Sequence, residues 1–271
     1  MGSRGPHIKE LFDLSGRVAM VVGGAQNLGL DMAEALAEAG ADLAITSRSA
    51  EKADVVAAEL SEHTGARVIG TVMSVDNETS VKAGFRYVAE QYGRLDVLVT
   101  TAGGARMSGG DSSVMGRLAA DFEAVVLLNI RGTFLCCREA ICMMLPARKG
   151  SIITVGSISG MVGRDRSVYI GSDMVPNMAD YSAAKGGVIA LTRDLAAEVG
   201  KWGIRVNCIS PGGFERGQPA EFIRRYNAQT MLGRMGKDGQ DLKGAVVYLA
   251  SDASGYVTGQ NLAVDGGFTA W

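Results

Sequence analysis

This chain has few residues that suit a metal centre or a disulfide framework. It has only four cysteines and two histidines, and no Cys-x-x-Cys pair. Cys136, Cys137 and Cys142 fall within one predicted helix, and Cys208 lies apart from them. This spacing favours buried, reduced thiols. We therefore expect a cytoplasmic protein that needs no metal ion.

The sequence also lacks an excess of charge of either sign and any long apolar run. Lysine and arginine number 27 against 29 aspartates and glutamates, so the formal net charge is −2 at pH 7. A nearly neutral chain offers no broad basic surface to a nucleic-acid backbone. The apolar runs are shorter than the ~20 residues that span a bilayer. We expect neither nucleic acid nor a membrane as a partner.

Glycine, in contrast, is abundant. The chain has 37 glycines in 271 residues, about twice the usual share of roughly 7%. They follow no triplet period, which excludes collagen. With 47% hydrophobic and 21% charged residues, the chain is suited to a folded domain with a sizeable core.

Short apolar runs alternate with helical patterns along the chain. The runs are nearly continuous in apolar residues, which is typical of parallel strands covered by helices on both faces. The expected strands are 17–22, 42–46, 68–72, 97–101, 152–155, 205–209 and 261–264. We predict one α/β domain over residues 12–271, a single doubly wound, Rossmann-like parallel sheet, preceded by a flexible arm over 1–11.

The first expected strand runs into a glycine-rich turn and then a helix. Glycines at such a turn let backbone N–H groups and the helix N-terminus approach a pyrophosphate. Asn27 takes the place of an expected glycine, and asparagine tolerates positive φ. A tight turn without a ligand is the alternative. The predicted dinucleotide contacts are Gly23, Gly24, Gln26, Asn27, Leu28 and Gly29.

Ser47 and Arg48 follow the second expected strand. Enzymes that use NAD place an acidic residue there to bind the ribose hydroxyls, whereas an arginine accommodates the 2′-phosphate of NADP. The acid is absent and the arginine is present, which predicts that NADP(H) is preferred over NAD(H). A solvated arginine that opens the next helix is the alternative.

The strongest local signal is the pair Tyr181 and Lys185. Residues four apart share a helix face, so the lysine ammonium can lie near the tyrosine hydroxyl. A nearby cation favours the phenolate, which makes proton transfer feasible near neutral pH. Ser157 follows a predicted buried strand, where its hydroxyl can donate to a carbonyl oxygen.

These residues, with the glycine turn and the tail segment 259–267, resemble the short-chain dehydrogenase/reductase family over roughly residues 12–269. The resemblance implies that Tyr181 is the catalytic acid or base, that Ser157 orients the carbonyl or hydroxyl group, and that Lys185 binds the nicotinamide ribose and lowers the tyrosine pKa. It also implies that Asn129 holds a relay water.

The resemblance adds further cofactor contacts and shows some departures. The added contacts are Ser74, Val75, Thr101, Ala102, Gly103, Pro211, Gly212 and Phe214, with Tyr181 and Lys185 at the nicotinamide end. Thr100 and Thr101 replace the family's paired asparagines, and Ser74 stands where an aspartate usually meets adenine. Arg216 occupies the place of a threonine that often touches the carboxamide, so it is a candidate for binding pyrophosphate or an acidic substrate, or a surface arginine.

Ser157 and Tyr181 are 24 residues apart, farther than is usual in the family. Tyr169 competes by spacing, but position 173 is aspartate rather than lysine, which favours Tyr181. We expect the extra residues, 161–179, to form a substrate loop in which Arg164, Arg166 and Tyr169 bind hydroxyls or a carboxylate. Packing on a neighbouring subunit or exposure to solvent is the alternative.

The resulting hypothesis is an NADP(H)-preferring oxidoreductase that acts on a small carbonyl or secondary-alcohol substrate, of sugar or gluconate type. The alternatives are a 3-oxoacyl thioester reductase, dehydration or epimerisation with bound cofactor, and a catalytically silent dinucleotide-binding protein. By resemblance the protein is a homotetramer whose interfaces use the helices over 121–145 and 181–199.

Overall fold

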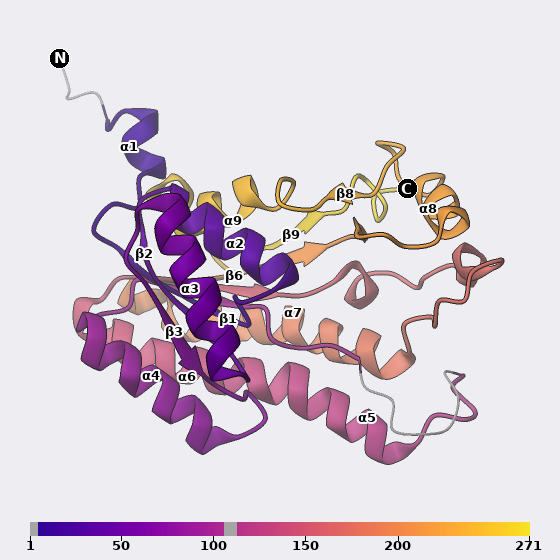
Figure 1. Cartoon of the computed structure of the whole chain (residues 1–271), viewed down its shortest axis with the longest axis horizontal. Helices are drawn as coiled ribbons and strands as arrows, with labels where there is room; N and C mark the ends of the chain where they lie inside the picture. The colour runs from indigo at the N-terminus through magenta and orange to yellow at the C-terminus, as the bar shows by residue number, and fades with distance from the viewer. Residues whose placement is uncertain (1–4, 106–112) are drawn as a thin grey trace.

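Figure 1 shows a computed structural model of the chain, which describes residues 5–105 and 113–271. Its centre is a seven-stranded parallel sheet in the order β3-β2-β1-β4-β5-β6-β9. The strands are β1 (Val18–Val22), β2 (Asp42–Ser47), β3 (Val68–Val72), β4 (Val97–Thr100), β5 (Gly150–Val155), β6 (Ile204–Pro211) and β9 (Asn261–Val264). Each expected strand is present, so the prediction of a doubly wound, Rossmann-like α/β fold is confirmed.

Helices cover both faces of this sheet, because successive side chains of a strand point to opposite faces. One face carries α2 (Asn27–Glu38), α3 (Ala50–Thr64) and α9 (Lys243–Ala250), and the other α4 (Glu78–Tyr92), α6 (Gly132–Met144) and α7 (Ala179–Val199) (Figure 1). Val21 packs into the first layer and Met20 into the second. Burial on both faces explains why the strands are continuously apolar.

The strand order changes direction at β1. The chain steps outward from β1 to β2 and β3, then returns to place β4 on the other side of β1. The connections therefore leave the carboxyl ends of β1 and β4 in opposite directions, which opens a crevice between them. The irregular stretch 103–117 begins at this crevice. The structure describes its residues 103–105 and 113–117, and residues 106–112 lie outside the described chain.

The predicted N-terminal arm contains a short helix that we did not expect. Helix α1 (Ile8–Phe12) begins after His7, whose side chain accepts a hydrogen bond from the Lys9 N–H at 3.2 Å. The Phe12 ring lies 6.4 Å from that of Tyr248 on α9. The helix at the boundary between the predicted arm and the predicted domain thus packs on α9 through Phe12.

A small second layer lies beyond the carboxyl ends of the strands. It contains helix α8 (Ala220–Asn227) and the two-stranded sheet of β7 (Phe214–Glu215) and β8 (Gly236–Lys237). A separate hydrophobic cluster, which includes Tyr169, Phe222, Tyr226 and Phe268, joins this layer to the segment after β5. In Figure 1 α8 and that segment lie at the same end of the molecule.

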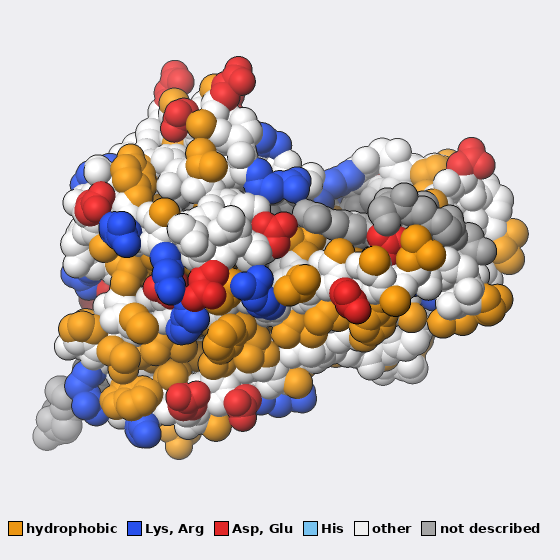
Figure 2. Space-filling model, turned by 90° about the horizontal axis from the view of Figure 1, so that it is seen from below, with side chains coloured by type: hydrophobic (Ala, Val, Ile, Leu, Met, Phe, Trp, Pro, Cys, Tyr) orange, Lys and Arg blue, Asp and Glu red, His pale blue; other side chains and the backbone are white. Residues whose placement is uncertain are grey.

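Figure 2 shows many hydrophobic side chains gathered on the side of the molecule opposite α2 and α9. The exposed large side chains of α5 (Ala119–Val126) and the helical turns that follow it include Phe122, Leu127 and Phe134. In the described residues no helix is long and apolar enough to cross a membrane. Cys136, Cys137 and Cys208 are buried, but Cys142 is exposed, contrary to expectation.

Candidate active site

The glycine-rich turn after β1 has the geometry that the sequence predicts for a phosphate-binding loop. Gly23 and Asn27 adopt positive φ angles of 82° and 51°, and the Gly23 N–H donates to Thr46 Oγ1 at 3.0 Å. A Cβ at Gly29 would collide with the Gly23 carbonyl oxygen and lie 2.6 Å from Thr101 Oγ1. Only glycine fits at position 29, so the helix N-terminus stays bare toward the crevice.

This turn borders a cavity of about 740 Å³ at the carboxyl ends of the strands. The predicted residues among its lining are Gly23, Gln26, Asn27, Leu28, Gly29, Ser47, Arg48, Ser74, Val75, Thr101, Ala102, Gly103, Ser157, Tyr181, Lys185, Pro211 and Gly212. The dinucleotide turn and the catalytic candidates therefore share one cleft. Its size and its glycine cradle fit a dinucleotide.

Two of the predicted cofactor residues do not line the cavity. A Cβ at Gly24 would lie 2.9 Å from the Val21 carbonyl oxygen and 3.0 Å from Ile45 Cγ2, so this glycine faces the core. Phe214 is also buried, and a Cβ at Gly236 would lie 2.7 Å from its ring. Close packing explains both residues, and any cofactor contact is left to their backbone atoms.

Two cationic side chains from the segment after β2, Arg48 and Lys52, line one end of the cavity. Arg48 is exposed and lines the cavity, as does Lys52, whose Nζ donates to Gln26 Oε1 at 2.6 Å. Among the described lining residues there is no aspartate or glutamate. The sequence analysis did not identify Lys52. The sequence did contain a signal for Lys52. A lysine in the first turn of a helix opposes the helix dipole, so its presence there suggests a role other than helix stability.

Ser157, Tyr181 and Lys185 converge at the other end of the cavity. Ser157 follows β5, and the other two lie one turn apart on α7. Lys185 Nζ donates to the Val155 carbonyl oxygen at 2.8 Å and lies 5.8 Å from the centre of the Tyr181 ring. The main chain at the end of β5 therefore holds the ammonium group close to the phenol.

Burial changes the proton affinities of this pair. It raises the pKa of Tyr181, against the opposing effects of a hydrogen bond with Ser157 and the positive charge of Arg164. It lowers the pKa of Lys185 to about 8. Lys185 is still mostly protonated at pH 7, so its charge is available to stabilise a phenolate.

Asn129 lies behind the wall of the cavity. It belongs to a π-helical turn, η1 (Leu127–Arg131), between α5 and α6. Its Nδ2 donates to the carbonyl oxygens of Gly104 and Val125 at 2.8 and 2.9 Å, and its Oδ1 accepts from the Gly104 N–H at 3.1 Å. The side chain thus fixes the backbone beside Gly103. The relay water remains a prediction.

Gly103 separates Asn129 from Lys185. A Cβ at this position would collide with Asn129 Oδ1 and lie 3.5 Å from Lys185 Nζ. The wider π-helical turn changes which carbonyl groups a side chain can reach, as is frequent at functional sites. The structure therefore brings all four catalytic candidates to one end of the cleft.

The inserted segment packs on its own chain, which neither alternative of the sequence analysis described. Tyr169 contacts the ring of Phe222 on α8, with ring centres 5.4 Å apart. Gln229 Nε2 donates to Asp165 at 3.0 Å. Tyr169, the competing catalytic candidate, is buried, and its hydroxyl accepts from Arg164 Nη1 at 2.6 Å.

Arg216 lines the cavity but is held by acids outside its lining. Its Nε donates to Asp238 Oδ2 at 2.8 Å, and its Nη2 pairs with Asp238 and, at 3.6 Å, with Asp31. Arg216 holds the pKa of Asp238 below its usual value, whereas burial raises that of Asp31. Arg216 therefore ties α2 to the loop after β8.

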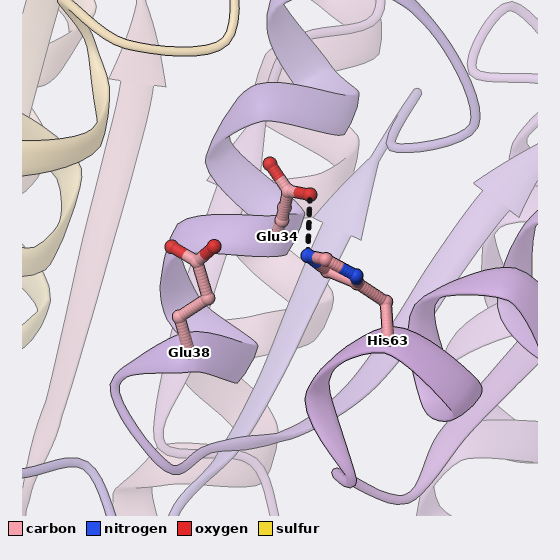
Figure 3. Close-up of side chains that lie close together, drawn as sticks. All are labelled: Glu34, Glu38 and His63. Carbon is pink, nitrogen blue, oxygen red and sulfur yellow. Dashed lines mark ion pairs between the residues drawn. The ribbon is translucent and has the colours of Figure 1, made fainter.

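Figure 3 shows a cluster of potential metal ligands remote from the cleft, formed by Glu34, Glu38 and His63. His63 Nε2 lies 3.7 Å from Glu34 Oε1. Lys243 Nζ lies 2.6 Å from Glu34 Oε2 and 2.8 Å from Glu38 Oε1. The lysine already compensates these carboxylates, so the cluster gives no support for a metal. That the protein needs no metal remains a prediction.

Comparison with known proteins identifies the family. Residues 23–269 match the family model described as enoyl-(acyl carrier protein) reductase. A 3-oxoacyl-(acyl-carrier-protein) reductase of Chlamydia trachomatis is 33% identical, over 94% of this chain and 98% of the relative. A D-threitol dehydrogenase of Mycolicibacterium smegmatis is 35% identical, over 95% of each chain.

A solved structure shows the same fold with a cofactor. It is a gluconate 5-dehydrogenase from Burkholderia cenocepacia in complex with NADP and tartrate, 31% identical, with a TM-score of 0.88 over 98% of this chain and all of that one. The chain belongs to the short-chain dehydrogenase/reductase family. It is an NAD(P)-binding oxidoreductase of alcohol and carbonyl groups in small molecules.

Proposed function

We propose that this protein is an NADP(H)-preferring oxidoreductase that interconverts a carbonyl group and a secondary alcohol in a small polyhydroxylated substrate, a sugar or a sugar acid. The observation that carries the proposal is one cleft with Arg48 and Lys52 at one end and Ser157, Tyr181 and Lys185 at the other. Two cations without a lining carboxylate suit the 2′-phosphate of NADP.

The chemistry follows from the groups at the closed end. When bound, the nicotinamide supplies or accepts the hydride. In reduction, the Tyr181 hydroxyl donates a proton to the carbonyl oxygen while Ser157 donates a hydrogen bond to it. In oxidation, the Tyr181 phenolate removes the proton from the alcohol. Lys185 stabilises that phenolate by its charge.

The experiment is a spectrophotometric screen of purified protein with NADPH and NADH. Keto sugars, keto acids and 3-oxoacyl thioesters are tested in reduction, and polyols and sugar acids in oxidation. Turnover of a sugar-type compound with NADPH preferred supports the proposal. Equal affinities for NADPH and NADH contradict the cofactor preference, and bound cofactor without net turnover supports epimerisation or a silent protein.

The second candidate is a 3-oxoacyl thioester reductase. The observation in its favour is the similarity to the Chlamydia reductase over nearly the full length of both chains. The same catalytic groups serve a keto thioester, so the two candidates differ only in what the substrate end of the cleft accepts. A higher kcat/KM for a 3-oxoacyl thioester than for every sugar-type compound favours this candidate.

We also propose a homotetramer whose interfaces use the helices over 121–145 and 181–199. The apolar side chains of Phe122, Leu127 and Phe134 on the first of these helices are 41–44% exposed in the single chain, which supports this arrangement. Sedimentation analysis tests it. A monomeric wild type contradicts the proposal, and dissociation of the Phe134→Glu variant supports it.

A further inference from the structure

The segment 161–178 rises directly from the two catalytic hydroxyl residues. It starts four residues after Ser157 and ends three before Tyr181. Asn177 Nδ2 donates to Ser159 Oγ at 3.4 Å, which ties the end of the segment to the turn that precedes it. At its base a Cβ on Gly160 would lie 2.5 Å from the backbone of Lys185. The segment is therefore anchored on the catalytic helix.

Arg164 in this segment is half-buried and has one hydrogen-bond partner among the described residues. Its Nη1 donates to the Tyr169 hydroxyl at 2.6 Å. Its Nε is buried without a partner in the part of the chain that the structure describes. Its positive charge lowers the pKa of Tyr181 and also that of Tyr226 on α8. The charge of Arg164 therefore acts on the phenol of the candidate catalytic residue.

The other half-buried arginines in the described residues are compensated. Arg17, Arg117, Arg138, Arg225 and Arg234 pair with carboxylates. Arg205 donates to three carbonyl oxygens and the Ser254 hydroxyl. Within residues 5–105 and 113–271, Arg164 has neither kind of compensation. The adjacent Asp165 does not supply it, because its oxygens accept from Ser167 and Gln229.

An arginine removed from water without a carboxylate partner is destabilising. The ordinary partner of its planar edge is a carboxylate that accepts two parallel hydrogen bonds. The edge formed by Nε and Nη2 of Arg164 has no such partner within the described protein. A ligand carboxylate that enters beside Tyr181 would satisfy it.

We propose that Arg164 binds a carboxylate of the substrate, so that among polyhydroxylated compounds the protein selects acids over neutral polyols. This inference rests on the proposed function, because the carboxylate belongs to the substrate of that reaction; Arg164 itself is not among the residues that line the cavity. Tyr169 is the positioning residue, because its hydroxyl accepts a hydrogen bond from Nη1. This contact leaves the edge formed by Nε and Nη2 for the carboxylate. Arg166, two residues further on, is exposed and donates to the Asn177 carbonyl oxygen at 2.8 Å.

The test uses three compounds of matched configuration, namely threitol, threonate and tartrate. All three have a four-carbon chain with hydroxyl groups on the two middle carbons. Threitol has no carboxylate, threonate has one and tartrate has two. Gluconate and glucitol form a six-carbon pair. Steady-state oxidation with NADP⁺ is measured for the wild type, Arg164→Gln and Arg164→Lys, with Arg166→Gln as the control that removes a charge from the same segment.

We expect the wild type to favour the acid of each pair in kcat/KM. Arg164→Gln raises KM for the acids by about ten- to a hundredfold, the range for a lost charge-assisted pair. KM for the neutral polyols and the affinity for NADPH stay unchanged, and kcat for the polyols changes only through the pKa of Tyr181. Arg164→Lys recovers part of the loss, because it restores charge without the planar edge. Arg166→Gln should behave as the wild type, because Arg166 is exposed and donates to the main chain at Asn177; this replaces the substrate contact that the sequence suggested for Arg166.

Equal losses for acids and polyols in Arg164→Gln would overturn the inference, because they indicate a structural role. So would a wild type that prefers the neutral compound of each pair. Tyr169→Phe gives a second line of evidence, since it retains the guanidinium group. It should raise KM for acids while leaving kcat and the polyols unaffected, and no change in KM for acids contradicts the positioning role.

Failure of this inference is distinguishable from failure of the proposed function. If only polyols or keto sugars are turned over, the proposed oxidoreductase activity is supported and the proposed contact with a carboxylate is contradicted. Calorimetric titration of tartrate and threonate into NADP⁺-saturated Tyr181→Phe protein tests binding without turnover. Binding that Arg164→Gln abolishes supports the inference even if no sugar-type compound turns over, and equal binding with and without Arg164 overturns it.

Discussion

Arg48 borders the cavity, Arg164 belongs to the segment between Ser157 and Tyr181, and the protein holds these two arginines in different ways. Arg48 is exposed at the end of a strand, next to a turn whose shape depends on missing side chains. Arg164 is half-buried in a long segment that packs on α8 and is held by Tyr169. The proposed cofactor end is shaped by local backbone geometry, whereas the proposed substrate end is shaped by contacts between segments that are distant in sequence.

This difference has energetic consequences. An exposed arginine costs nothing while it is solvated, so Arg48 can discriminate between cofactors without straining the free protein. A half-buried arginine without a carboxylate carries a desolvation cost that a ligand relieves. Substitutions at the two ends should therefore affect different ligands.

The largest effect should come from the reacting group itself. Tyr181→Phe removes the hydroxyl that transfers the proton, so kcat should fall by about 10² to 10⁴. The affinity for NADPH, measured by fluorescence titration, should stay unchanged. Tyr256→Phe is the matched control, because Tyr256 is fully exposed. Loss of turnover in Tyr169→Phe instead would transfer the catalytic role to Tyr169.

Substitution of the cofactor-end cation should separate the two cofactors. Arg48→Ala should weaken NADPH binding by one to two decades, about 1.5 to 3 kcal/mol, because a charge-assisted contact to the 2′-phosphate is lost. NADH binding should hardly change. Lys52→Ala should act in the same direction. Arg86→Ala on α4 is the exposed control, and a parallel loss for both cofactors would contradict the assignment.

A side chain at the turn should affect both cofactors alike. Gly29→Ala forces a methyl group against the Gly23 carbonyl oxygen and Thr101, and overpacking of this kind costs about 1 to 3 kcal/mol. Chemical denaturation and titrations with NADPH and NADH measure the effect. Gly244→Ala is the control, because its Cβ meets no atom within 4 Å. An unchanged free energy of unfolding in Gly29→Ala would show that the turn relaxes.

The smallest effect should be a shift of the pH profile. Oxidation needs the phenolate of Tyr181, so kcat/KM rises with pH through the pKa of that residue. Arg164 lowers this pKa, so its removal in Arg164→Gln should move the rise to higher pH. A neutral polyol as substrate keeps carboxylate binding out of the measurement. Lys185, with a pKa of about 8, is present in both the wild type and Arg164→Gln, so it does not cause a difference between them. Coincident profiles of the two proteins would contradict the electrostatic effect of Arg164.

The cofactor end was the more predictable of the two from sequence. The seven strands and the glycine turn were placed correctly because they depend on neighbouring residues, apolar runs and positive φ at Asn27. Lys52 was missed because its relevance depends on α3 packing beside the turn. Helix α1 was missed because its packing partner, Tyr248, is distant in sequence.

The substrate end shows the limit of sequence reasoning. The 24-residue spacing indicated an insertion, and the absence of a lysine after Tyr169 favoured Tyr181. Where the insertion packs was not predictable, since it depends on the contacts of Tyr169 with Phe222 and of Asp165 with Gln229. The π-helical turn at Asn129 was equally hidden, because its hydrogen bonds are to Gly104 and Val125.

The sequence by itself determined the parallel α/β sheet, the dinucleotide turn and the candidates Ser157, Tyr181 and Lys185. These features follow from periodicity and from groups spaced by a turn of helix or the end of a strand. Only the tertiary structure decided which half-buried arginine lacks charge compensation among the described residues and which cations border the cleft. Burial and charge compensation depend on the neighbours in space, and a residue's neighbours in the chain do not specify them.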